Sequence, residues 1–236
     1  MKKLALAALA ALALNLAHAA ELEGFKFDDR LKLGNADLVV NGTGVRSKFG
    51  KRYAMALYLP AKTTDAKAAL AAKGPKRVDV RLIKDASGDT FANAISGAIN
   101  DNSTDAEKAT LKDRIKQLSD TVIAIDEIKA GGSIIFDWVP GKGTILTING
   151  QIKGKEIAGE DFYTGLLRAW LGEDPVQDDL KQGLLGDKGL FTTGEWVAVK
   201  GLRQFVQCLL VFLSCWCLQD TQEGITDLGF FGVRDR

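Results

Sequence analysis

One arginine and one tyrosine stand at a spacing that suits the binding of an anion. Arg46 follows a segment in which Gly42 and Gly44 predict a turn, and Tyr53 begins a run with alternating apolar positions. In a strand, alternate side chains share one face. The next residues on the face of Tyr53 are Met55, Leu57 and Leu59. A guanidinium and a phenol at the edge of such a face predict a site for a small anionic, partly apolar ligand.

Imidazole and thiol chemistry are excluded from the body of the chain. The single histidine, His18, lies in an N-terminal segment that we expect to be removed. The mature chain therefore has no Ser-His-Asp or Cys-His catalysis and no histidine metal ligand. The cysteines all lie near the C-terminus, at Cys208, Cys215 and Cys217. We expect no metal and no cofactor, and the chemistry that is left belongs to arginine, lysine, tyrosine, carboxylates, hydroxyls and amides.

The first twenty residues have the pattern of a secretory signal peptide. Lys2 and Lys3 precede an apolar Ala/Leu run, and Ala17-His18-Ala19 is a small-x-small cleavage site. The run is too short for a spanning helix, which needs roughly 20 apolar residues. An uncleaved N-terminal anchor is the alternative. We expect cleavage, export and localisation in a bacterial periplasm.

The charge balance predicts no polyanionic partner. The chain contains 31 Lys and Arg against 30 Asp and Glu, and no basic face suggests nucleic acid as a partner. The composition, 46% hydrophobic and 26% charged, is that of an ordinary globular protein with one core.

The periodicity of the apolar residues predicts an α+β fold. Strands are expected over residues 25–40 (one or two strands), 49–59, 78–83, 133–139, 144–149 and 151–157. Helices are expected after an N-cap at Thr64 or Asp65, after one at Asp89, after a Thr104–Glu107 capping box, over 160–171 and over 175–185. Because strands and helices do not alternate regularly, an antiparallel sheet with helices on one face is favoured over a parallel doubly wound sheet.

Residues 187–236 differ in character from the body. The stretch 204–218 combines a long apolar run with all the cysteines, and it is short for a transmembrane span. Three interpretations are open: a membrane-associating or partner-binding helix, a further element of the fold, or a shifted or extended reading frame outside it. We favour the last and expect a signal peptide at 1–20, a domain at 21–186 and an atypical tail. Membrane association is expected only if the tail belongs to the native protein.

Four motifs are spread through the body in a characteristic order. They are Gly44-Val-Arg-Ser47, the strand Tyr53–Leu59, the segment Gly131–Phe136, and Ala169-Trp-Leu-Gly172 followed by Pro175. Together they resemble the bacterial exported branch of the chalcone isomerase family. The resemblance implies an α+β, chalcone isomerase-like open-faced β-sandwich, in which a large antiparallel sheet carries helices packed on one face.

The resemblance implies two alternative roles for Arg46. In the plant isomerases, an arginine after a Gly-rich turn polarises the substrate, so Arg46 would be the catalytic electrophile of an isomerase (an intramolecular lyase) acting on an enone or chalcone-like phenolic substrate. In the fatty-acid-binding branch the arginine is paired with a tyrosine, so Arg46 and Tyr53 would hold a carboxylate. The apolar residues that would then surround an acyl chain are Met55, Phe91, Ile95, Leu166 and Trp170.

Three functions follow as alternatives. The first is binding of a small amphipathic, fatty-acid-like carboxylic acid; the second is the isomerase activity; the third is a non-catalytic accessory protein that kept the fold and lost the pocket. Binding ranks first because Phe91, Ala98 and Ala169-Trp170 stand where the enzymes carry hydroxyl or amide groups. Neither nucleic acid nor metal is expected as a partner.

Overall fold

The computed structural model describes residues 20–186, so residues 1–19 of the predicted signal peptide and the predicted tail lie outside the described residues. The strands are β1 (Ala20–Leu22), β2 (Phe25–Phe27), β3 (Arg30–Leu33), β4 (Ala36–Ser47), β5 (Lys51–Leu59), β6 (Lys76–Leu82), β7 (Ala86–Ser87), β8 (Glu127–Ile128), β9 (Ser133–Val139), β10 (Gly143–Ile148) and β11 (Gln151–Ile157). The helices are α2 (Ala66–Ala71), α3 (Gly88–Asp101), α4 (Asp105–Ile123), α5 (Glu160–Leu171) and α6 (Asp178–Leu184). Among these residues no helix combines the length and apolarity needed to cross a membrane.

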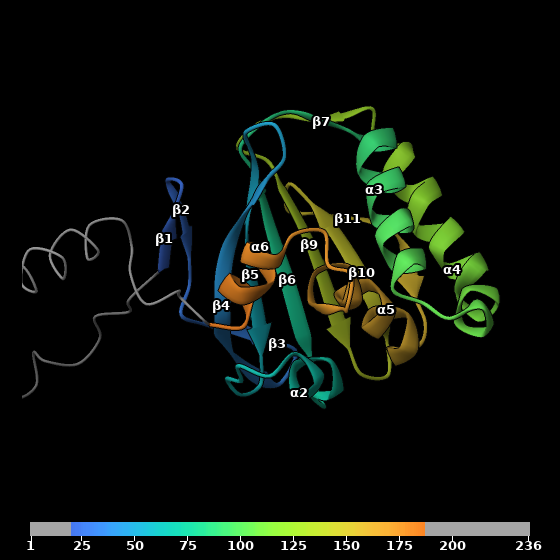
Figure 1. The fold of residues 1–236 in the computed structure, drawn as a ribbon, viewed down its shortest axis with the longest axis horizontal. Helices are drawn as coiled ribbons and strands as arrows, with labels where there is room; N and C mark the ends of the chain where they lie inside the picture. The colour runs from blue at the N-terminus through green and yellow to red at the C-terminus, as the bar shows by residue number, and fades with distance from the viewer. Residues whose placement is uncertain (1–19, 187–236) are drawn as a thin grey trace, which may run out of the picture. The chain divides into compact units, whose positions relative to one another are not determined.

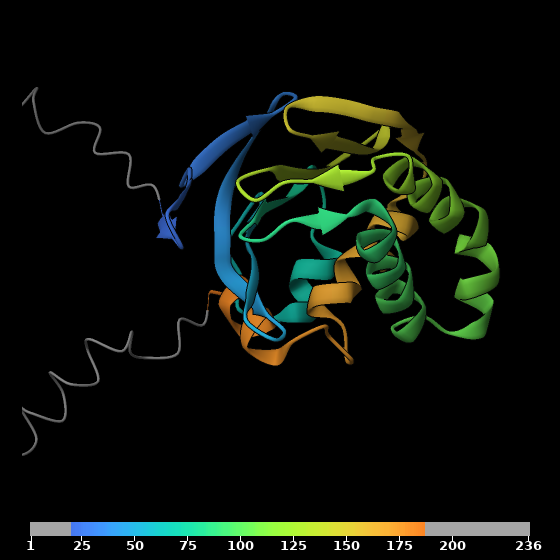
Figure 2. The ribbon, with the colours of Figure 1, turned by 90° about the horizontal axis from the view of Figure 1, so that it is seen from above.

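Seven strands form one antiparallel sheet in the order β11-β10-β9-β6-β5-β4-β3 (Figure 1). The sheet is curved, and α3, α4 and α5 gather on its concave side (Figure 2). The α+β class and the antiparallel sheet with helices on one face are thus confirmed. The predicted hairpin of β9 and β10, the strand β11 and the helix α5 are also present at the expected positions.

Strand β5 separates two cores. On the helix side, the main core contains Met55, Leu57 and Leu59. On the other side, a smaller core contains Ala54, Ala56 and Tyr58. Phe27 of β2 and Leu38 of β4 close this smaller core. The alternation predicted from the sequence is confirmed, and the small alanine side chains lie where the N-terminal strands pack against the sheet.

The prediction of a turn around Gly42 and Gly44 is wrong. Strand β4 runs through both glycines, and the chain turns only between β4 and β5, where Phe49 and Gly50 have positive φ. The two glycines instead make room for α6, which lies against β4 (Figure 1). A Cβ atom on Gly44 would lie 2.6 Å from Leu180 Cδ1, which is closer than real side chains approach.

Helix α6 begins later than predicted, at Asp178 rather than at Pro175. Gln177, the residue before the helix, is extended, with φ −168° and ψ 130°. Its side-chain Oε1 accepts a hydrogen bond from the backbone N–H of Ser47 at 2.8 Å. The chain therefore runs along β4 before the helix starts.

Two further predictions are corrected in detail. Residues 25–40 contain β2, β3 and the start of β4, which is one strand more than expected. Helix α3 is capped by Ser87 rather than by Asp89, because the Ser87 hydroxyl accepts from the backbone N–H of Thr90 at 3.3 Å. Asp89 lies in the first turn, where its charge still favours the helix N-terminus.

The predicted capping box of α4 is confirmed and is tied to α5. Thr104 Oγ1 accepts from Glu107 N, and Glu107 Oε2 accepts from Thr104 N at 2.9 Å. Arg168 of α5 donates to Glu107 Oε1 at 2.8 Å. The hydrogen bonds from Arg168 and from the Thr104 backbone lower the pKa of Glu107 to about 2. One carboxylate thus satisfies a helix end and joins two helices.

We predict that Glu107→Gln reduces the loss of stability in acid. The carboxyl titrates near 4.5 in the unfolded chain and at about 2 in the folded protein, so its stabilisation is complete above pH 4.5 and is lost as the pH falls toward 2. Glutamine retains a capping side chain without this titration. Urea unfolding at neutral and acidic pH measures the difference, with Asp113→Asn as the control on the same helix. If Glu107→Gln lost as much stability at acidic pH as the wild type, the role given to the Glu107 carboxylate would be wrong.

Candidate functional site

A cavity of about 390 Å³ lies between the turn end of the sheet and helix α3. Four cationic side chains line it: Arg46, Lys48, Arg52 and Lys84. None of them forms an ion pair within residues 20–186, and no carboxylate is among the lining side chains. An uncompensated cationic lining in a partly enclosed site favours an anionic ligand.

Arg46 is held by a neutral partner. Its Nη1 donates to Gln177 Oε1 at 3.1 Å and to the Ser47 carbonyl at 3.1 Å. Gln177 is itself fixed by the backbone of β4, because its Nε2 donates to the Val45 carbonyl at 3.2 Å. A carboxylate in the place of Gln177 would neutralise the guanidinium, whereas the amide orients it and leaves its charge available.

Tyr53 lies directly opposite Arg46 in the pairing of β4 and β5. Its hydroxyl oxygen accepts a hydrogen bond from Trp170 Nε1 at 3.0 Å. The phenolic O–H donates to no acceptor within the described part of the chain, so it is free to donate into the cavity. Burial raises the pKa of Tyr53 to about 12, opposed in part by the Trp170 hydrogen bond and the Arg46 charge. Tyr53 is therefore a neutral hydrogen-bond donor at ordinary pH.

The apolar wall of the cavity comes mainly from α3 and β6. Phe91 and Ala94 of α3 and Leu82 of β6 line it. The Phe91 ring stacks on Phe136, with centroids 6.4 Å apart and planes 12° apart, and Phe136 in turn lies 6.4 Å from the Trp170 ring. Phe91, which lines the cavity, is therefore packed against aromatic rings of the main core.

The structure brings Arg46, Tyr53 and Phe91 together at this cavity. The other residues expected there lie behind the wall in the main core: Met55, Ile95, Leu166 and Trp170. Trp170 reaches the site through its indole N–H, which orients the Tyr53 hydroxyl. An acyl chain would therefore meet Phe91 and Leu82 rather than Met55.

Two residues at this site, Lys84 and Gln177, were not predicted from the sequence. Lys84 follows β6 and Gln177 precedes α6, so neither is near the Arg46 motif in the chain. Only the strand pairing and the packing of α6 on β4 bring them to it. Lys48 and Arg52 belong to the motif itself. The absence of carboxylates from that stretch of sequence could have indicated that these cations are unpaired.

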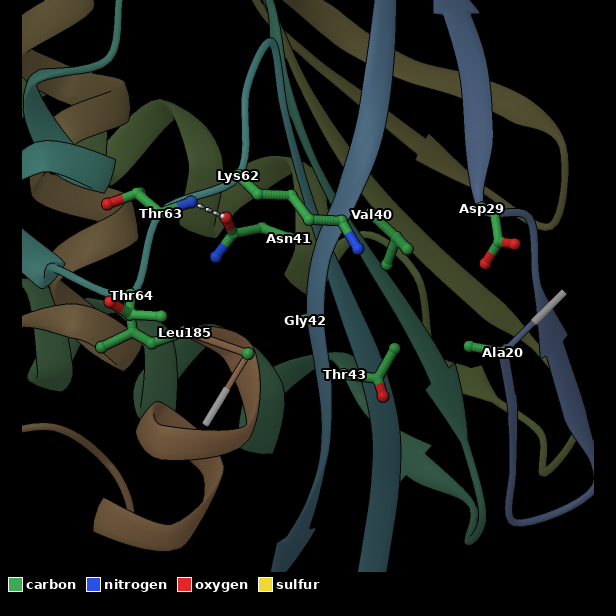
Figure 3. A pocket seen from close by; sticks show the side chains of 11 residues that line it. Ala20, Asp29, Val40, Asn41, Gly42, Thr43, Lys62, Thr63, Thr64 and Leu185 are labelled. Carbon is green, nitrogen blue, oxygen red and sulfur yellow. Dashed lines mark hydrogen bonds between the residues drawn. The ribbon is translucent and has the colours of Figure 1, made fainter. Parts of the chain in front are cut away.

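A second cavity, of about 500 Å³, lies beside residues 40–43 of β4, with residues 62–64 and the chain after α6 among its walls (Figure 3). Its lining includes one carboxylate and one cation, Asp29 and Lys62. It also includes the amide of Asn41, whose Oδ1 accepts from Thr63 N and whose Nδ2 donates to the Leu184 carbonyl, both at 2.7 Å. Asn41 therefore joins β4 to a loop and to α6 (Figure 3). The cavity is bounded by Ala20 and Gly186, the first and last described residues.

A third cavity, of about 780 Å³, lies between α2, α5 and the connection of α3 to α4. Its charges are mixed, and Arg168 and Glu107 in its wall pair with each other. No group of three or more metal-ligating side chains occurs in residues 20–186. Of these three cavities, the Arg46 cavity is the one lined by cations without a carboxylate.

We predict that no tyrosine ionises at its ordinary pKa in the native protein. Burial raises the pKa of each of the three tyrosines above 10.0, Tyr53 to about 12 and Tyr58 and Tyr163 further. The tyrosines ionise at a lower pH in the unfolded chain than in the native protein. Their contribution to the free energy of unfolding is therefore complete below pH 10 and falls as the pH rises through 12.

The phenolate absorbance of native and urea-unfolded protein, measured against pH, tests this expectation. Tyr53→Phe should remove the first native step, near pH 12. Coincident native and unfolded curves below that step would contradict the geometry described for Tyr53.

The chain was compared with known sequences, structures and families. No curated protein sequence matches the chain. Among solved structures, a fatty-acid binding protein of Arabidopsis thaliana superposes with a TM-score of 0.56 and 14% sequence identity, over 72% of this chain and 97% of that chain, which shows a common fold. The family model described as chalcone isomerase-like matches residues 19–186. Because that match covers most of the sequence, the chain belongs to the chalcone isomerase-like family.

Proposed function

We propose that this protein binds a small amphipathic carboxylic acid, similar to a fatty acid, with its carboxylate on Arg46 and Tyr53. The observation that carries the proposal is a cavity with four cations and no carboxylate, in which the guanidinium and a neutral phenol come from directly paired residues. Charge-assisted hydrogen bonds to a carboxylate are among the strongest available to a protein.

The donors are well placed for this ligand. Within residues 20–186, every hydrogen bond of the Arg46 side chain starts from Nη1, so Nη2 and Nε retain N–H groups for a carboxylate. The Tyr53 O–H supplies one more donor. The hydroxyl oxygen of Tyr53 accepts its hydrogen bond from Trp170, so it need not accept one from the ligand. The ligand oxygens would therefore meet donors only.

The cavity also suits an apolar chain. Its volume of about 390 Å³ lies within the range of roughly 300–1,000 Å³ that is typical of ligand pockets. Phe91 and Leu82 offer an apolar wall beside the cationic groups. The similar Arabidopsis structure is a fatty-acid binding protein, which supports the same ligand class here. A non-catalytic accessory protein that had lost the pocket would have a filled core at Arg46. The cavity beside Arg46 argues against that alternative.

A second candidate is the isomerase activity, with Arg46 as the electrophile. Arg46 and Tyr53 both line the cavity, and two donors from these groups would stabilise the oxygen of an enolate as well as a carboxylate. Turnover of a chalcone by the full chain, lost in Arg46→Ala, would favour this activity. Binding remains first because the phenylalanine at position 91 presents no hydroxyl to the cavity.

We predict that Arg46→Ala removes the bound acid while the melting temperature stays nearly unchanged. Gln177 keeps its bonds to Ser47 N and the Val45 carbonyl without the guanidinium, so the fold loses little. Native mass spectrometry and organic extraction of the purified protein measure the ligand.

The matched control is Lys51→Ala, because Lys51 pairs with Glu23 and does not line the cavity. Tyr53→Phe should weaken binding by about tenfold, the worth of one hydrogen bond. Retention of the acid in Arg46→Ala, or a large loss of stability, would refute the proposed anchor.

We also propose that residues 1–20 are a cleaved signal peptide, that the protein acts in the periplasm, and that residues 187–236 lie outside the fold. The n-region, the apolar run and the cleavage site support export, and the change in composition supports the separate tail. The mass of the protein purified from its native source tests both expectations. We expect a start at Ala20 or Glu21; a retained Met1, or peptides from residues 201–236, would contradict the respective expectation.

A further inference from the structure

The turn between β4 and β5 presents an aromatic ring to water at the mouth of the Arg46 cavity. Phe49 is 96% exposed, more than the other exposed large apolar residues of the described chain, Ile152 at 68% and Ile123 at 44%. It also has a φ of +54°, which is uncommon for a bulky side chain. Unfavourable backbone conformations of this kind are concentrated at functional sites.

The turn is defined by its hydrogen bonds. The backbone N–H of Lys48 donates to the Gly50 carbonyl at 3.0 Å, and Gly50 has a φ of +98°. The conformation therefore holds Phe49 at the apex of the turn, which lies at the same end of the sheet as β7 (Figure 1). The ring is not buried by any described part of the chain.

Two lysines lie at the turn that carries Phe49. Lys48 is its neighbour in sequence, and Lys84 Nζ would lie only 3.4 Å from a Cβ atom on Gly50, so Lys84 reaches the turn from β6. Neither lysine forms an ion pair within residues 20–186. Two carboxylates of this region are already paired: Glu23 with Lys51, which follows the turn, and Asp85, the sequence neighbour of Lys84, with Lys129.

We propose that this turn docks the protein on the surface of an anionic phospholipid bilayer, with Phe49 at the interface and Lys48 and Lys84 on the headgroups. An exposed aromatic among basic residues is the combination that binds such an interface. A single exposed ring offers too little area for a stable protein–protein interface, whereas a bilayer accepts the ring and the cations separately. The charges of the turn complement those of the bilayer.

Docking at this place gives the cavity access to its ligand. Phe49 and Lys48 line the same cavity as Arg46, so a docked turn would bring the cavity mouth to the depth where the acyl chains begin. This role in ligand exchange rests on the proposed function; the docking itself does not. A contact made by one ring and two lysines is weak, reversible and sensitive to salt.

The test is cosedimentation of the full chain with vesicles of phosphatidylglycerol and phosphatidylcholine, compared with vesicles of phosphatidylcholine alone. We expect binding to the anionic vesicles that falls with added salt. Phe49→Asn keeps a residue that tolerates positive φ and removes the ring, so it should weaken vesicle binding by about tenfold. Phe49→Trp should retain binding, since tryptophan also favours the interface.

The combined Lys48→Gln and Lys84→Gln variant should weaken vesicle binding by roughly thirtyfold. The matched controls are Ile152→Ala, an exposed apolar residue on β11, and Lys155→Gln, an exposed lysine of the same strand. Both controls should bind like the wild type. Equal binding to the two kinds of vesicle, no binding, or unchanged binding by Phe49→Asn would overturn the proposal.

Arg46→Ala separates this inference from the proposed function. It should lose the extracted acid yet bind anionic vesicles like the wild type. An acid that copurifies with a chain that binds no vesicles would overturn docking alone. Vesicle binding by a chain that never carries an acid would overturn the proposed function and leave docking in place.

Discussion

The close approach of helix α6 to strand β4 is the constraint on which the site depends. Glycines on both elements permit it: a Cβ atom on Gly183 would lie 2.6 Å from the Thr43 carbonyl oxygen, and one on Gly44 would meet Leu180 at the same distance. Side chains at either position would push the helix away. Because the helix sits so close, Gln177 reaches the end of β4 and bonds to Ser47 and Arg46.

The chemical consequence is a cation that is oriented but not neutralised. An ion pair would have fixed Arg46 equally well and would have cancelled its charge. Gln177 provides direction through an uncharged carbonyl oxygen, and Trp170 does the same for Tyr53 from the other side. Both partners lie in or beside the helices, while both functional groups lie on the sheet. The helical layer therefore sets the geometry of a site whose active groups belong to β4 and β5.

The same arrangement explains how an apolar fold tolerates a cationic cavity. The four cations line the open end of the sheet, where solvent still reaches them, and the aromatic series of Phe91, Phe136 and Trp170 closes the cavity toward the core. Charge stays at the mouth because a charge further inside would lose its hydration without gaining a partner. An amphipathic ligand has the same division, with its anionic group at the mouth and its apolar part on the rings.

The sequence by itself determined the local features of this protein. The alternation in β5 assigned its two faces correctly, and the Thr104–Glu107 spacing identified the start of α4. Each of these depends on residues that are close in the chain, where strand periodicity and capping act directly.

The tertiary structure decided what surrounds Arg46 and Tyr53. Gln177 and Trp170 are more than a hundred residues from their partners Arg46 and Tyr53, so no local pattern could pair them. The two glycines of β4 suggested a turn because their local preference is for turns, but the need for space beneath α6 overrode it. Packing of distant elements also places Met55, Ile95 and Trp170 behind the cavity wall and Lys84 at the cavity. Side-chain neighbours across a sheet and a helical layer are set by three-dimensional register rather than by sequence spacing.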